Sequence, residues 1–254
     1  MSRSTRYSAA AALFSILCAA PAAAQLAPSR GGQPRSGELD IACGPRAVYG
    51  MPSTVLTLTG SERETTGLIP PYHGLIVNAG TDQGIAVGQE YYVRRIIPPM
   101  DRGKWVPGEP IGIHTLGWIK IVRVEADQAV ADSLYACAGY EIGDYLEPYS
   151  AAPAEPKPLP PGEPDFANPG HILFGDERRA MGAGSNLMVI DRGSDHGLKP
   201  GQQLTVFRRG VNGTGPILSV ARGTAISVSA ETAMVRLEGA RDAVYAGDLI
   251  ALHR

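Results

Sequence analysis

The sequence predicts an all-β protein of two tandem small β-barrel-like domains, joined by a Pro-rich linker and preceded by a cleaved signal peptide. Three observations favour this fold class. Gly (31) and Pro (21) are frequent and aromatic residues make up only 6% of the 254 residues, a profile typical of short strands joined by many turns. A glycine-rich turn motif occurs twice in the chain. Between its two copies, seven prolines lie within residues 150–169.

The first 24 residues have the pattern of a secretory signal peptide. Arg3 and Arg6 give a positive start, residues 9–20 are apolar, and three alanines precede Gln25. This apolar run is shorter than the ~20 residues that a membrane-spanning helix needs, and no later segment is apolar over 18 residues. We therefore expect cleavage before Gln25, a periplasmic or secreted location, and no transmembrane segment.

Cleavage would leave two cysteines, Cys43 and Cys137, in a compartment that permits disulfides. We predict that they form a bridge that ties the N-terminal segment to the first β domain. The alternative is two separate thiols that behave as small buried hydrophobic residues.

Composition also divides the chain into segments. After the signal peptide (1–24), we expect a flexible segment (25–39), a first β domain (40–149), the linker (150–169) and a second β domain (170–254). Proline fixes φ and lacks a backbone donor, so the linker can join neither a helix interior nor a central strand. It is expected to be an extended, semi-rigid spacer.

The segments on the two sides of the linker repeat each other, which is the strongest evidence for two related domains. Residues 76–89 match residues 189–202 at an offset of 113, so that Gly80, Asp82, Gly84, Gly88 and Gln89 fall on Gly193, Asp195, Gly197, Gly201 and Gln202. Further on, where Gly143-Asp144 matches Gly247-Asp248, the offset is 104. The difference of nine residues is an insertion between Arg95 and Gly117 in the first copy. We therefore expect the same strand order in residues 70–147 and 185–254.

Each copy is expected to hold five or six short strands. Alternation of apolar and polar residues, as in Ala233–Leu237, is typical of a half-buried strand. Asn212-Gly213 predicts a hairpin. Such small domains are marginally stable, so each is expected to recruit its upstream segment, Ile41–Leu58 or His171–Gly175. In order, the other predicted strands are Tyr91–Arg95, Trp118–Val124, Ala129–Ser133 and Tyr145–Leu146 in the first copy, and Leu187–Ile190, Gln203–Arg208, Thr224–Val228 and Leu249–Leu252 in the second.

A family resemblance rests on three of these features and on Gly170–Asp176 (GHILFGD). The features are the Gly-x-x-x-Gly-[Ile/Leu]-x-x-Gly-Gln turn, the following strand that ends in Arg, and the closing Gly-Asp strand. Together they resemble the β-rich region found after the LysM module in some bacterial peptidoglycan-binding proteins. The repeat is also similar to the C-terminal domain of flagellar assembly protein T. The resemblance covers most of residues 70–147 and 170–254. It implies a Gram-negative cell-envelope accessory protein, not an enzyme, whose partner is an envelope protein or a peptidoglycan-associated complex.

Residue patterns predict no catalytic, metal or cofactor site. Asp191-x-Gly-x-Asp195 could start a calcium loop, with Asn78 and Asp82 in the same places of the first copy, but the further ligands of an EF-hand are missing. We expect structural turns there, with the carboxylates bonding nearby amides. The five His share no metal spacing, and 23 basic against 25 acidic residues argue against a nucleic-acid partner. The alternative function is a secreted hydrolase with a site formed between the domains.

The insertion between Arg95 and Gly117 is predicted to bind a partner. It carries Met100, Arg102 and Trp105, and four prolines stiffen it. Large side chains on a rigid loop lose little entropy on binding, so Trp105 is the expected anchor. The alternative is that the loop folds back and caps its own barrel.

Overall fold

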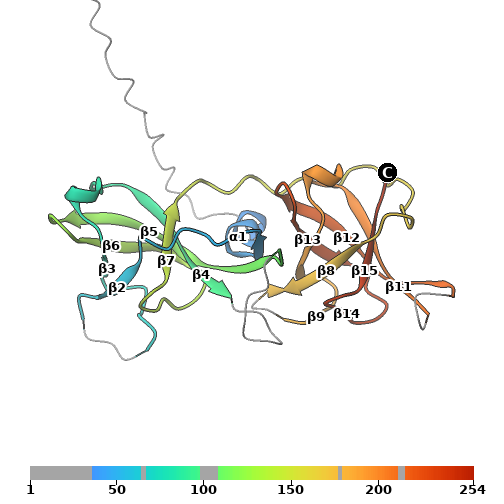
Figure 1. The fold of residues 1–254 in the computed structure, drawn as a ribbon, viewed down its shortest axis with the longest axis horizontal. Helices are drawn as coiled ribbons and strands as arrows, with labels where there is room; N and C mark the ends of the chain where they lie inside the picture. Colours follow the sequence, from blue (N-terminus) through green and yellow to red (C-terminus); the bar gives the residue numbers. More distant parts are fainter. Residues whose placement is uncertain (1–35, 64–66, 98–107, 177–178, 211–214) are drawn as a thin grey trace, which may run out of the picture. The chain divides into compact units, whose positions relative to one another are not determined.

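The computed structural model describes residues 36–63, 67–97, 108–176, 179–210 and 215–254. Pro34–Arg254 form one compact unit, and the predicted signal peptide lies outside the described residues. Within the described part, strands dominate and α1 (Ser36–Cys43) is the one α-helix. The sequence predicts a flexible segment up to residue 39, whereas helix begins at Ser36. The structure is therefore mostly β, as predicted (Figure 1).

The first copy forms a seven-stranded antiparallel sheet (Figure 1). Six strands follow the order β2-β3-β6-β5-β4-β7, and β1 pairs with β5 off this path. The strands are β1 (Arg46–Val48), β2 (Leu58–Ser61), β3 (Leu75–Val77), β4 (Glu90–Ile97), β5 (Ile111–Val124), β6 (Ala129–Ala136) and β7 (Tyr145–Pro148).

The second copy forms a closed six-stranded barrel in the order β10-β13-β12-β11-β15-β8. A separate two-stranded ribbon, β9 (Met181–Gly182) with β14 (Val244–Tyr245), accompanies it. The barrel strands are β8 (Gly170–Gly175), β10 (Leu187–Ile190), β11 (Gln203–Arg209), β12 (Ile217–Val228), β13 (Ala233–Glu238) and β15 (Leu249–Leu252).

The two copies share one strand order, as the internal repeat predicts. β2, β3, β6, β5, β4 and β7 correspond in turn to β8, β10, β13, β12, β11 and β15. The irregularities correspond as well: the register shifts after Val93 in β4 and after Val206 in β11, which are equivalent positions. A bulge changes the direction in which the side chains after it point. Since both copies have the bulge at the same position, equivalent side chains point the same way in both.

The prediction of two barrel-like domains is confirmed in part: the second copy is a closed barrel, whereas the sheet of the first copy is open. In the second copy β15 and β8 pair through Leu249↔His171 and Ile250↔Gly170. The equivalent strands of the first copy meet only at their ends, at the isolated bridge Thr57↔Tyr145 and the backbone hydrogen bonds beside it, such as Leu146 N–H to the Leu56 carbonyl at 2.8 Å. The chain reaches β2 from β1, and β1 pairs with β5. Only the last residues before β2 therefore lie beside β7.

Each copy has its own apolar core. Leu58, Val93 and Ile119 are buried in the first core. In β13, Val235 enters the second core while Arg236 lies on the other face, as the predicted alternation requires. Burial of these side chains, at about 25 cal/mol per Å² of apolar surface, is the main stabilising contribution in each copy.

Most of the Pro-rich segment has neither helix nor strand, and the second barrel binds its C-terminal part. The amides of Leu159 and Asp165 donate to the carbonyls of Gly201 (2.7 Å) and Leu252 (2.9 Å). Pro164 and His253 form an isolated bridge. Residues between the prolines supply the backbone N–H donors that proline lacks. This part of the segment is therefore hydrogen-bonded to the barrel rather than a free spacer.

The nine-residue insertion lies where the sequence places it. Ile96↔Ile113 in the first copy and Arg209↔Ile217 in the second are the equivalent last shared pairs of the hairpin. In the first copy one more pair, Ile97↔Gly112, extends the stem. The predicted binding residues Met100, Arg102 and Trp105 lie outside the described residues, so their role stays a prediction.

Two glycines of the repeated turn are required for different reasons, lack of space for a side chain and a left-handed backbone, and two variants can test this. Gly197 has φ 78° and open space around it, whereas a Cβ atom at Gly193 would overlap the carbonyl oxygens of Ser229 and Ala230. We expect Gly193→Ala to lower the free energy of unfolding by about 2–3 kcal/mol, because backbone must move. Gly197→Ala should cost only about 1 kcal/mol, the cost of a left-handed residue. Urea titration of both variants checks this order; an equal loss would contradict it.

Candidate functional site

Cys43 and Cys137 form a disulfide, with their Cα atoms 5.7 Å apart, which confirms the predicted bridge. Cys43 is the last residue of α1, and Cys137 follows β6 directly. The bridge therefore fastens the N-terminal helix to the first sheet.

Four aromatic side chains of the first copy form a cluster against α1. Trp118 stacks on Tyr135 with ring centroids 4.8 Å apart and on Tyr149 at 5.7 Å, and Tyr92 meets it edge-on. Ala42 of α1 packs on this cluster, and Trp118 is buried. Stacked rings on a sheet face could hold a flat ligand, but here the helix covers them. The cluster serves packing.

The strongest ion pairs occur twice, at equivalent places. Arg95 binds both carboxylate oxygens of the buried Asp144, at 2.7 and 2.8 Å. Arg208 binds Asp248 in the same way, at 2.7 Å to each oxygen. These are the Arg that ends the strand and the Asp of the Gly-Asp turn in the sequence motif. Since each pair joins β4 to β7 or β11 to β15, the motif residues hold the fold.

Arg94 is the one buried arginine in the described part of the chain, and it stands where the second copy has Phe207. Its guanidinium lies 4.6 Å from the centre of the Tyr92 ring, and Nη1 donates to Thr115 Oγ1 at 3.1 Å. Nε approaches Glu147 to 2.8 Å, as an ion pair without hydrogen-bond alignment. Burial is the main cause that lowers the pKa of Arg94, and the nearby Arg46 lowers it further.

The residues of the considered calcium loop are used in the fold. Asp191 accepts the amide of His171 at 2.6 Å, and Asn78 accepts the amide of Thr57 at 2.8 Å. The bonded amides lie about 20 residues away rather than nearby, so the expected local turn is wrong for this pair. No group of three or more metal-binding side chains occurs among the described residues. Asp191 thus anchors the start of β8, and Asn78 anchors the residue before β2.

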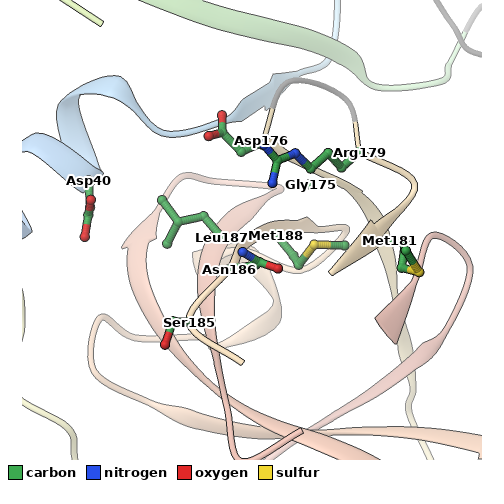
Figure 2. A pocket seen from close by; sticks show the side chains of 9 residues that line it. All are labelled: Asp40, Gly175, Asp176, Arg179, Met181, Ser185, Asn186, Leu187 and Met188. Carbon is green, nitrogen blue, oxygen red and sulfur yellow. The ribbon is translucent and has the colours of Figure 1, made fainter. Parts of the chain in front are cut away.

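A pocket of about 200 Å³ opens beside the second barrel (Figure 2). Asp40 of α1 stands on one side of it and Met181 of β9 on the other. We call this the β9 pocket. The other lining residues are Gly175, Asp176, Arg179, Ser185, Asn186, Leu187 and Met188. Sequence reasoning missed this site, because its residues come from separate segments.

Exposed apolar side chains continue from the β9 pocket across the barrel surface. Met181 pairs with Tyr245 across the β9–β14 ribbon, and the Arg208 guanidinium lies 5.2 Å from the centre of the Tyr245 ring. Arg208 in turn pairs with Leu218 across β11 and β12. Met181, Tyr245 and Leu218 are 52%, 46% and 56% exposed. We call these four residues the apolar rim.

The first copy differs at the equivalent place. Leu68 and Glu141 stand where the rim has Met181 and Tyr245. Glu62 lies against Gly74, where the second copy has Leu187, and its carboxylate binds Arg123. The first copy therefore lacks the Met181–Tyr245 pair of the rim.

Ser185 in the pocket wall has φ 71°, the one non-glycine residue with a left-handed backbone among those described. Such a conformation costs roughly 1–2 kcal/mol with a side chain present, and glycine adds some entropy to the unfolded chain. We therefore expect Ser185→Gly to raise the free energy of unfolding by about 0.5–1 kcal/mol. A thermal melt of that variant is the measurement, and a lower midpoint would contradict the reasoning.

Comparison of the sequence with protein-family models and with curated proteins gives no match. Among the described residues, no helix is both long enough and apolar enough to span a bilayer.

Proposed function

We propose that this protein is an exported binding or assembly protein of the cell envelope, without catalytic activity. The observation that carries the proposal is the Cys43–Cys137 disulfide. Disulfides persist in oxidising compartments and are rare in the cytosol. The bridge thus supports the same destination as the signal pattern of residues 1–24.

A binding role, rather than a reaction, agrees with how the charged side chains are used. The buried acids Asp144 and Asp248 are each held by an arginine of the same repeat. The described lining of the β9 pocket contains carboxylates and Arg179 but no histidine or cysteine.

The envelope as the location, and a peptidoglycan-associated complex as the partner, rest on the resemblance to the region after LysM modules. The β9 pocket with the apolar rim, and the predicted Trp105 loop, are the two surfaces on which a partner would bind.

Expression of the full chain in a Gram-negative host tests the proposal. We expect the periplasmic fraction to hold a chain that begins at Gln25 and has no free thiol. Isolated peptidoglycan sacculi and an envelope extract then serve as parallel baits, with Trp105→Ala as the variant expected to lose capture. A full-length chain that stays in the cytoplasm with all three of its cysteines as free thiols would refute the proposal.

A further inference from the structure

We propose that the β9 pocket and the apolar rim bind an extended peptide segment of a partner protein, with a lysine side chain in the pocket and apolar side chains on the rim. This inference rests on the proposed binding function and names the chemistry of the partner at one surface.

The charge of the pocket favours a cation. Two carboxylates, Asp40 and Asp176, and one guanidinium, Arg179, line it. Next to it, Arg236 pairs with Asp40 at 2.9 Å and with Glu155 at 3.0 Å. Among the described residues at this place, the three acids outnumber the two arginines by one. A partner ammonium group is therefore attracted and a carboxylate is repelled.

The apolar part of the lining fits the stem of a lysine. Met181, Leu187 and Met188 line the same pocket as the acids. Lysine places a compact charge at the end of four methylene groups, which pack on apolar surface while the head stays polar. Thioether side chains adapt well to such a stem. A volume of about 200 Å³ is below the ~300–1,000 Å³ of pockets for drug-sized ligands, and so suits one long side chain.

The rim supplies a rigid surface for the neighbouring residues of that segment. Arg208 is held by Asp248 and also by Asp242 at 2.9 Å, so the guanidinium under Tyr245 is fixed before binding. Tyrosine, methionine and arginine are enriched at protein interfaces, and a pre-ordered surface loses less entropy on binding. The rim crosses from the ribbon to β11 and β12, a line that an extended chain can follow.

The test is a titration of the purified, disulfide-bonded chain with a blocked peptide of sequence Leu-Lys-Leu-Val, followed by the NMR shifts of backbone amides. The matched probe replaces lysine by norleucine, which keeps the stem and removes the charge. We expect saturable shifts at residues 181–188 and 245, and at least tenfold weaker binding of the norleucine peptide.

Variants distinguish binding in the β9 pocket from nonspecific binding to exposed apolar side chains. Met181→Ser and Asp176→Asn should each weaken binding of the lysine peptide about fivefold or more. Leu68→Ser, which removes an equally exposed (58%) side chain at the equivalent place of the first copy, should leave it unchanged. Binding that ignores the lysine, or that falls equally in Leu68→Ser, overturns the inference. If the chain is exported and captures an envelope partner while the peptide does not bind, this inference fails and the proposed function stands.

Discussion

A chain in which Cys43 and Cys137 are both alanine is expected to lose about 4–5 kcal/mol of unfolding free energy. The disulfide closes a loop over a sequence separation of 94, and the chain-entropy model predicts a contribution of this size for a loop of about that length. The loss also has a local part. Once released, α1 still packs on the Trp118 cluster and keeps the ion pair of Asp40 with Arg236, but a helix of eight residues is not stable by itself.

Urea titration measures this loss, and the reduced wild-type chain is the matched control. Both should unfold at the same lower urea concentration. Hydrogen exchange should speed up first in residues 36–43. An unchanged midpoint in the double variant would show that the bridge adds nothing to stability.

Arg95→Met and Arg208→Met are each expected to destabilise the chain by about 3 kcal/mol. Removing one partner of a buried ion pair leaves the other charge without its main compensation, a change that typically costs 3–5 kcal/mol. Asp144 and Asp248 are buried, and each keeps only a backbone amide, that of Glu141 or of Tyr245. Because the two copies are built alike, the two losses should be similar.

Arg123→Met is the control for this pair of variants. Arg123 binds Glu62, but both side chains are well exposed, and such surface pairs contribute at most ~1 kcal/mol. The double variant Arg95→Met with Asp144→Leu should recover part of the stability, since no lone charge stays buried. Equal effects of Arg95→Met and Arg123→Met in denaturant titrations would contradict the structural role of the repeated pair.

The repeat could be predicted from the sequence because its turns depend on local chemistry. Gly84 and Gly197 have φ 81° and 78°, which glycine adopts without strain, so the turn is visible wherever the residues recur. The strand order and the insertion followed from that alignment. The disulfide followed from counting two cysteines in a chain whose sequence predicts export.

Other features depend on contacts between distant segments and carry no local signal. α1 has only Glu38 as a favourable charge in its first turn, and its helix is held by packing and the disulfide. The open first sheet depends on the route from β1 to β2. The β9 pocket joins residue 40 to residues 175–188, and the rim exists because β9 pairs with β14. The alternation of apolar and polar residues predicts single strands, but it does not show which distant segments lie next to each other.

The docked Pro-rich segment decides where the second half of the chain can be cut. A fragment that starts at residue 170 would lose the bridge to His253 and the edge-on contact of Phe166 with Phe207, whose ring centroids are 5.0 Å apart. The end of the chain would then present unpaired amides and carbonyls beside a bare aromatic ring, a combination that promotes aggregation. A fragment that starts near Pro156 keeps both contacts. Expression trials and protease digests of the isolated half should therefore be designed around the earlier boundary.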